Sequence, residues 1–463
     1  MSLPAELLEA VSAPGGGKIT LVVGAGCSFE APTSIPLARQ CSQECHDRLV
    51  ANGVLAIGDC STPSNLSSLA DAVVAKTGKQ RLLVEQLSQH YALRTATPNE
   101  GHSLAAALLR EGAITSILTL NFDLALTTAI SALGVGDRVG IIDSPDDLAN
   151  QKTINLYYLH RNANAADPET WILRTEALTN EWKGTWESVV AAKVLATPIV
   201  VFAGLGNPAD VLIESTKLIQ KAIPSGIRAY QVDPVDCDKS EFFKALALDP
   251  SAFRQATWCD FMADLSQRLL VAHTSQLRTA AETIVTREHL ASEDLTALLS
   301  RLEEIGLLKV GFLRSSWLLH EKPYYPEELQ VRERIADLLL AAALIARVTN
   351  TTAVLFDDGF VEFRRDDRTV ATHVFVSGGG TRSRSAIEAE LSMRKRRYRG
   401  RPSPPGGAII AGTSDISGGP ITPPADLLLG ETSGSIVLEP SALQLFHVAS
   451  LRQDSAQCQQ VAP

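Results

Sequence analysis

The sequence predicts an α/β fold for its first 273 residues, with a mostly parallel sheet covered by helices. From about residue 18 to residue 273, short β-branched runs alternate with apolar residues at helical spacing, which is the pattern of strand–helix–strand units. The chain has 463 residues, of which 45% are hydrophobic, enough for a buried core and for two or three domains. We therefore expect one domain at 1–273 and a second at 274–463.

Six short apolar runs are the expected strands of this sheet, because runs of four to eight apolar residues suit strands buried on both faces. They span residues 19–23, 114–119, 139–142, 154–159, 199–203 and 227–232. Apolar residues at helical spacing between the runs predict the covering helices. These helices are expected at 66–87, 124–132, 182–195 and 211–222.

After Thr274 the pattern changes, and an α+β appendage is expected. Long helical periodicity is followed by two apolar runs that an acidic-basic turn separates. The expected elements are helices at 283–308 and 327–348 and strands at 353–363 and 369–376.

Two stretches near the end of the chain have no regular pattern, and a basic run precedes them. Glycine and proline supply 12 of the 25 residues at 400–424, which predicts a loop, and residues 453–463 are expected to form a frayed tail. Eight basic residues lie between Arg382 and Arg401, most of them from Arg394 onward. Such a run can bind phosphates, but it is more often a solvated helix face or a contact with an acidic surface of a protein partner. Nucleic acid is therefore the lesser expectation for this run.

The composition excludes several classes of protein. The net charge of −10 provides no overall basic field for nucleic acid or anionic membranes. No apolar run approaches the roughly 18–20 residues of a membrane span, and residues 1–18 lack the pattern of a secretory signal. The seven cysteines are scattered and odd in number, as expected of reduced thiols. A cytoplasmic protein without disulfides or membrane contact is the resulting expectation.

A glycine-rich turn follows the first expected strand. Gly24 and Gly26 allow the backbone to approach an anion, and Ser28 adds a hydroxyl, so a dinucleotide pyrophosphate is a suitable ligand. A tight turn that binds nothing explains the same residues. No third glycine follows at the offset of the dehydrogenase fingerprint, and Glu44 falls within a predicted helix. Hydride transfer is therefore disfavoured.

Polar residues also follow two further expected strands. Asn121 and Asp123 come directly after residues 114–119, and His160 follows residues 154–159. Ligands of open α/β sheets bind at the carboxyl ends of strands, where these side chains fall. Asn121 or Asp123 can instead simply cap the following helix, and a lone histidine is more often structural than catalytic.

A second glycine turn, with Gly204 and Gly206, follows the strand at 199–203. The next strand ends near Asp233. A second nucleotide-facing turn is therefore expected here, at the same edge of the sheet.

Read together, these motifs resemble the sirtuin family, and more closely the sirtuin-like domains of bacterial anti-phage defence proteins. The resemblance covers roughly residues 18–273 and lies in the order and spacing of several short motifs. These are Gly-Ala-Gly-x-Ser at 24–28 with Ile35-Pro36 after it, Pro98-Asn99-x-x-His102, Thr119-Leu-Asn121-Phe-Asp123, His160, Gly204-Leu-Gly206 and Asp233.

The resemblance implies a Rossmann-like fold that binds NAD in an extended pocket, with NAD as substrate. It implies that the phosphates lie at the first glycine turn and the adenosine end nearer the strand that ends at 233. The residues so implied are Gly24, Ala25, Gly26, Ser28, Gly204, Gly206 and Asp233.

The resemblance also implies catalytic roles for three residues. Asn121 would orient the nicotinamide ribose or the attacking water, Asp123 would contact the carboxamide, and His160 would act as the base. Cleavage of the bond to nicotinamide creates an oxocarbenium-like centre, so a site that holds the leaving group and places a nucleophile suits these groups.

Two departures from the family pattern bear on the reaction. No cysteine lies between Cys60 and Cys237, where deacylating sirtuins carry two cysteine pairs, so no such zinc module is expected. Cys41 and Cys45 are a lone pair, expected to be half-buried thiols on a helix. Arg161 stands where the family has glycine after the histidine. Both departures favour water as the acceptor.

We therefore expect an NAD⁺ glycohydrolase that releases nicotinamide and ADP-ribose and depletes cellular NAD⁺ in abortive infection by phage. Residues 274–463 are expected to supply a regulatory region, an oligomerisation surface or a site for a partner protein. The alternatives are a zinc-free deacylase or ADP-ribosyltransferase, and a non-catalytic module that senses NAD or ADP-ribose.

Overall fold

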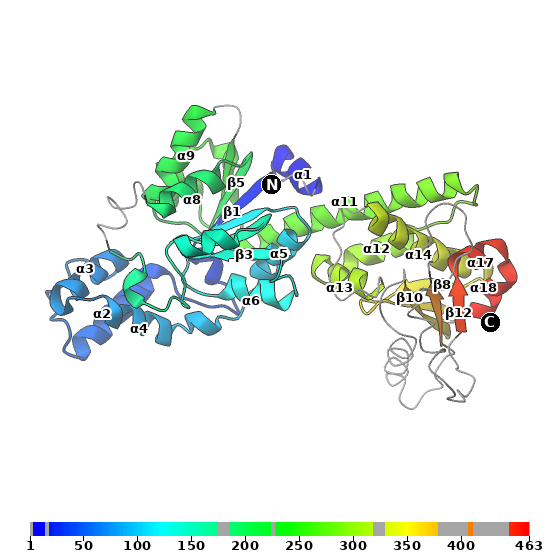
Figure 1. Cartoon of the computed structure of the whole chain (residues 1–463), viewed down its shortest axis with the longest axis horizontal. Helices are drawn as coiled ribbons and strands as arrows, with labels where there is room; N and C mark the ends of the chain where they lie inside the picture. The colour runs from blue at the N-terminus through cyan, green and yellow to red at the C-terminus, as the bar shows by residue number, and fades with distance from the viewer. Residues whose placement is uncertain are drawn as a thin grey trace. The chain divides into compact units, whose positions relative to one another are not determined.

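The computed structural model describes residues 3–13, 18–174, 185–223, 227–317, 329–377, 406–410 and 444–462. The chain forms two compact units, Met1–Arg268 (unit 1) and Leu269–Pro463 (unit 2) (Figure 1). The boundary lies inside one long helix, α11 (Trp258–Arg287), a few residues before the position expected from the sequence. Among the described residues, no helix is both long and apolar enough to cross a membrane.

Unit 1 contains a seven-stranded sheet in the order β3-β4-β2-β1-β5-β6-β7, and every neighbouring pair is parallel. This confirms the predicted α/β fold. The central strands β1 and β5 are buried along their whole length, which explains why they are continuous apolar runs. The strands are β1 (Ile19–Val23), β2 (Ser116–Thr119), β3 (Val139–Ile142), β4 (Ile154–Tyr158), β5 (Ile199–Ala203), β6 (Arg228–Asp233) and the short, unpredicted β7 (Phe253–Gln255).

Helices α2, α3 and α4 pack on one another and gather in one group within unit 1 (Figure 1). The single helix predicted at 66–87 is wrong. Gly78 adopts the left-handed conformation at φ 77° and ends α3, as glycine does at many helix C-termini. The helices of unit 1 are α1 (Ala5–Ser12), α2 (Ala38–Ala51), α3 (Leu66–Thr77), α4 (Arg81–His90), α5 (Glu100–Arg110), α6 (Ala125–Ala132), α8 (Trp186–Leu195), α9 (Asp210–Ala222) and α10 (Glu241–Leu246).

Unit 2 combines helices with a mixed five-stranded sheet in the order β12-β11-β10-β9-β8. Strands β8, β9 and β10 are antiparallel neighbours, whereas β10, β11 and β12 pair in parallel. Apolar side chains of α12, α14, α18 and the sheet form its core. Its elements are α12 (Thr296–Ile305), α13 (Leu307–Trp317), α14 (Leu329–Val348), β8 (Thr352–Leu355), β9 (Phe360–Arg364), β10 (Val370–Ser377), β11 (Gly406–Ile410), β12 (Gln444–His447), α17 (Val448–Gln453) and α18 (Ser455–Val461).

Two predictions for unit 2 are wrong, and in each a glycine with positive φ accounts for one of the breaks. The helix expected at 283–308 is the end of α11, then α12, then the start of α13, and Gly306 at φ 83° separates the last two. The strand expected at 353–363 is a hairpin of β8 and β9, which turns at Gly359 with φ 91°. An Asp-Gly pair at this turn is a known hairpin signal.

Two stretches expected to be irregular contain regular structure. Strand β11 lies inside the glycine- and proline-rich stretch and pairs with β10. The expected frayed tail contains α18, whose Cys458 and Val461 are buried in the core of unit 2. Burial of apolar side chains outweighs the weak local signal in α18. The basic run from Arg394 to Arg401 lies outside the described residues.

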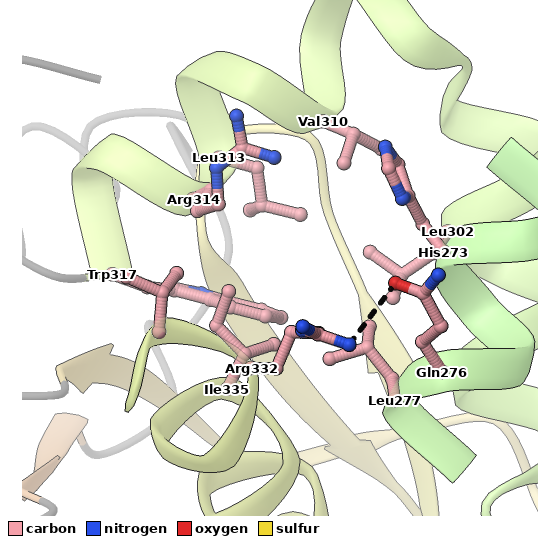
Figure 2. A pocket seen from close by; sticks show the side chains of 11 residues that line it. His273, Gln276, Leu277, Leu302, Val310, Leu313, Arg314, Trp317, Arg332 and Ile335 are labelled. Atoms are coloured by element: carbon pink, nitrogen blue, oxygen red, sulfur yellow. Dashed lines mark hydrogen bonds between the residues drawn. The ribbon is translucent and has the colours of Figure 1, made fainter. Parts of the chain in front are cut away.

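A small cavity of about 40 Å³ lies among the helices of unit 2. Figure 2 shows the side chains of Arg332 and Gln276 pointing toward each other in its wall, with a 3.4 Å hydrogen bond from Nη1 to Oε1. Most of the other lining side chains are apolar, among them Leu277, Val310 and Trp317.

Candidate functional site

The polar residues singled out in the sequence lie at the carboxyl edge of five consecutive strands. Register pairs Val23 of β1 with Thr119 of β2 and Thr119 with Tyr158 of β4. Asn121 and His160 therefore stand two residues beyond a paired position on adjacent strands, which are roughly 4.8 Å apart. On the other side of β1, Val23 pairs with Ala203 of β5. Ligands of open α/β sheets bind at this edge, where the connections diverge to either side.

Ser28, Asn121 and Asp123 form a hydrogen-bonded network at this edge. Ser28 Oγ donates to Asp123 Oδ2 at 2.8 Å. Asn121 Nδ2 donates to Ser28 Oγ at 3.1 Å and to the carbonyl of Gly24 at 3.1 Å. Since both acceptors bind the amide nitrogen, the network fixes the orientation of the Asn121 side chain. Its Oδ1 remains the acceptor directed away from these contacts.

Asp123 is buried and its two carboxylate oxygens have separate partners. Oδ2 accepts from Ser28, and Oδ1 accepts from the backbone N–H of Ala125 at the start of α6. Asp123 therefore accepts from the first helical residue of α6, from the position before the N-cap Leu124. Burial raises the pKa of the Asp123 carboxyl group, while the hydrogen bonds from Ala125 and Ser28 oppose that rise. The geometry supports a role for Asp123 in holding Ser28 and α6.

His160 is half-buried at the end of β4, and its ring centroid lies 6.4 Å from that of Phe122. Phe122 in turn stacks on Trp171 at 4.3 Å. Desolvation by these surroundings lowers the pKa of His160 to about 4. The imidazole is therefore neutral at pH 7, which is the form that accepts a proton.

The two glycine turns pack directly against each other. Gly24 N–H donates to the carbonyl of Ala203 at 2.9 Å, and Gly26 N–H donates to that of Gly204 at 3.0 Å. A Cβ on Gly24 would lie 2.5 Å from the Gly204 oxygen, and one on Gly26 would lie 2.8 Å from the Gly204 Cα. Close packing explains these glycines, and their own amides are occupied by backbone carbonyls. The expected contact of Gly24 and Gly26 with phosphates stays a prediction.

Asp233 and Gly206 lie further along the same edge. Asp233 ends β6, and its Oδ1 accepts from the backbone N–H of Val235 at 3.0 Å. Burial raises the pKa of this carboxyl group. The carbonyl of Gly206 accepts from Phe242 N–H. A Cβ on Gly206 would meet no atom within 4 Å. The edge is thus open at Gly206, in contrast to the tight packing at Gly24.

Asn99 and Glu30 fix the first glycine turn to two helices. The Asn99 amide donates to the carbonyl of Cys27 at 2.8 Å and forms a capping box with His102 at the start of α5. Desolvation lowers the pKa of the buried His102 to about 4. Glu30 Oε1 accepts from the backbone N–H groups of Trp258 and Cys259, which begin α11. The Asn99-x-x-His102 motif therefore has a structural role in the described contacts.

Sequence reasoning missed Asp143, which directly follows β3 and so belongs to the same edge. Burial and the neighbouring carboxylate of Asp147 raise the pKa of Asp143 to about 6, whereas Arg161 lowers it. The Arg161 guanidinium donates to the backbone carbonyl of Asp143. Asp143 directly follows the strand predicted at 139–142, and this position is the sequence signal that could have identified it.

The part of the chain that the structure describes contains no group of three His, Cys, Asp or Glu residues that could hold a metal ion. The expectation of a metal-free reaction remains a prediction. Cys41 and Cys45 are free, buried thiols on α2. Burial raises their pKa to about 12 and about 11, so neither is a reactive thiolate at neutral pH.

No protein-family model matches the sequence, and no curated protein sequence matches it. Among solved structures, a mutant Sir2 homologue bound to 2′-O-acetyl ADP ribose is 15% identical, with a TM-score of 0.38, over 58% of this chain and 98% of its own. A Sir2 homologue in complex with NAD is 14% identical, with a TM-score of 0.37, over 58% and 95%. A Sir2 complex with a p53 peptide and NAD⁺ is 13% identical, with a TM-score of 0.32, over 57% and 96%. This likeness is too distant to assign a ligand or an activity to the chain.

Proposed function

We propose that unit 1 is an NAD⁺ glycohydrolase. The observation that carries this proposal is the fixed amide of Asn121, which donates inward to Gly24 and Ser28. Its Oδ1 is the acceptor of the same amide, and His160 follows the adjacent strand at the same edge of the sheet. An acceptor and a neutral imidazole on neighbouring strands suit a water molecule that must be oriented and deprotonated.

The proposed reaction breaks the bond between the ribose C1′ and the nicotinamide nitrogen. Nicotinamide leaves with the bonding electron pair and becomes neutral, and positive charge develops on the ribose. A water oxygen bonds to C1′ and the released proton passes to His160, so ADP-ribose and nicotinamide are the products. Asn121 Oδ1 accepts a hydrogen bond from this water, which fixes its direction of attack.

Asp123 contributes to this reaction mainly through Ser28. Both of its oxygens already accept hydrogen bonds, from Ser28 and from Ala125. The carboxylate keeps the Ser28 hydroxyl oriented, and the hydroxyl oxygen in turn accepts from Asn121. This arrangement favours a positioning role over the direct carboxamide contact that the resemblance implies.

Nicotinamide release from NAD⁺ by the purified full-length chain tests the proposal. We expect Asn121→Ala and His160→Ala each to lower kcat by at least about 100-fold. Arg228→Ala is the matched control, because the exposed Arg228 side chain pairs with the exposed Glu6. Wild-type turnover that both site variants retain would refute the assignment, provided that all proteins show the same melting temperature.

Two alternatives remain as outcomes of the same assay. A zinc-free deacylase or an ADP-ribosyltransferase would consume NAD⁺ only when a protein acceptor is added. A sensing module would bind NAD⁺ or ADP-ribose in calorimetry and leave the dinucleotide intact. The low pKa of His160, about 4, favours the sensing module over the enzymes in one respect, since so weak a base provides little driving force for proton transfer.

The biological role that we propose is depletion of NAD⁺ during phage infection, with unit 2 as the region that responds to a partner or to self-association. The motif resemblance to defence proteins supports this role. Cells that carry the wild-type gene should lose NAD⁺ after infection, and cells with Asn121→Ala should not. Equal NAD⁺ levels in the two strains after infection would argue against it.

A further inference from the structure

Arg161 has an unusual backbone conformation for its side chain. It directly follows His160, and its φ of 74° lies in the left-handed region. Residues with a Cβ are strained there, and glycine is not. A strained residue persists where the surrounding contacts hold it, and such residues cluster at functional sites.

Two contacts hold the Arg161 side chain, and they come from different elements. The guanidinium donates to the backbone carbonyl of Asp143, at the end of β3. Its central carbon also lies 5.1 Å from the ring centroid of Trp186, the first residue of α8. A planar guanidinium can donate in its plane and stack on an aromatic face together, which lysine does poorly. Arg161 thus bridges β3 and α8 from the loop after β4.

The same loop is held on its other side by contacts toward β2. Ala163 N–H donates to the carbonyl of Phe122 at 2.8 Å, and Arg94 Nε donates to the carbonyl of Ala163 at 2.7 Å. The carbonyl of His160 accepts from Ile172 N–H at 3.4 Å. The Arg161 contacts fix the loop toward β3 and α8, and the Asn162 side chain adds a hydrogen bond to the Asp143 carboxyl group.

We infer that Arg161 is a positioning residue for His160: its side chain fixes the loop after β4 so that the imidazole stays at the carboxyl edge beside Asn121. This inference rests on the proposed function for its catalytic consequence. Glycine would relieve the backbone at position 161 but would remove both side-chain contacts. Arginine at position 161 therefore combines a strained backbone with two side-chain contacts that glycine cannot make.

The pair Arg161→Gly and Arg161→Ala tests this inference in the full-length chain. Both variants lose the contacts with Asp143 and Trp186, but only alanine keeps the left-handed strain. We expect the glycine variant to melt about 2–4 °C above the alanine variant, and both to lose about 100-fold in kcat with little change in KM. A glycine variant within threefold of wild-type kcat would overturn the inference.

Two further variants separate positioning from stability. Arg368→Gly is the matched control, because Arg368 is exposed in unit 2 and has a φ of 64°. It should gain stability by the same backbone effect and keep full kcat. Arg161→Lys keeps a cation and one donor, so it should recover kcat to within about tenfold of wild type. A lysine variant as inactive as the alanine variant, together with equal losses of stability, would count against positioning.

A readout that needs no turnover distinguishes failure of this inference from failure of the proposed function. If wild type releases no nicotinamide, the proposed function fails. Histidine NMR still tests whether Arg161 fixes the loop that carries His160. The His160 signal, assigned by its loss in His160→Asn, should titrate near pH 4 in wild type. It should move toward the ordinary value near 6.5 in Arg161→Gly, as water reaches the loosened loop. An unchanged titration would overturn the inference.

Discussion

The hydroxyl of Ser28 donates a 2.8 Å hydrogen bond to the carboxylate of Asp123, and both residues are buried. The bond joins the turn after β1 to the start of α6. Since Ser28 Oγ also accepts from Asn121, the direction of this bond determines which way the Asn121 amide faces. One serine hydroxyl therefore connects a buried charge to the side chain that we propose orients water.

Replacement of Ser28 by alanine should disorder the Asn121 amide. The variant leaves one Asn121 donor without its partner and leaves Asp123 Oδ2 buried without its donor, at a cost of about 1–3 kcal/mol. We expect kcat for nicotinamide release to fall by about 10- to 100-fold with KM nearly unchanged. The exposed Ser131 on α6 provides the control Ser131→Ala. Equal kcat values for the two variants would contradict this role of Ser28.

Replacement of Gly24 by alanine should destabilise unit 1 through packing alone. The new Cβ would lie 2.5 Å from the carbonyl oxygen of Gly204, and overpacking of this kind typically costs about 1–3 kcal/mol. Gly206→Ala is the control, since its Cβ would meet nothing within 4 Å. Urea unfolding should separate the two variants, and identical midpoints would show that the turns do not pack as described.

The position of Asn121 and His160 at one edge of the sheet follows from the sequence, because the carboxyl ends of parallel strands meet at one edge. Their place on adjacent strands depends on the pairing of β2 with β4. The apolar runs that precede Asn121 and His160 are long enough to be recognised as strands in the sequence. The contact of Gly24 with Gly204 could not be predicted in the same way. It depends on the pairing of β1 with β5, which no local pattern encodes.

The directions of loop side chains could not be predicted from the sequence either. Arg161 could have lain across the site, but it contacts Asp143 and Trp186 instead. The Asn99-x-x-His102 motif was recognised through the resemblance but not as a capping box, and nothing in it showed that the Asn99 amide donates to the carbonyl of Cys27. These contacts join residues far apart along the chain, so they follow from packing and not from local propensity.

Acid should destabilise the protein in part through His102. Its folded-state pKa is about 4, below the ordinary value of about 6.5. The unfolded chain therefore binds a proton that the folded chain excludes, and stability falls as the pH drops from 6.5 toward 4. At pH 5 the loss from this residue is about 2 kcal/mol.

His102→Gln isolates that contribution from the other titrating groups. Glutamine can still accept from Asn99 N–H as in an ordinary capping box, but it does not titrate. The difference in unfolding free energy between wild type and variant, measured by urea at pH 7 and pH 5, should shrink by about 2 kcal/mol at the lower pH. If the difference in unfolding free energy stays constant with pH, then His102 binds a proton in the folded state as readily as in the unfolded state.

The last helix should be required for the stability of unit 2. Cys458 on α18 is fully buried in the core of this unit, and its thiol donates to the carbonyl of Leu451. Helix α18 packs on α14 (Leu329–Val348).

Cys458→Asp would place an unpaired charge in that core, at a cost of about 3–5 kcal/mol. Backbone amides of α14 should then exchange hydrogen about 100-fold faster or more. Gln459→Asp, at the exposed neighbouring position, should leave their protection unchanged. Equal exchange in both variants would mean that the end of the chain contributes nothing to this core.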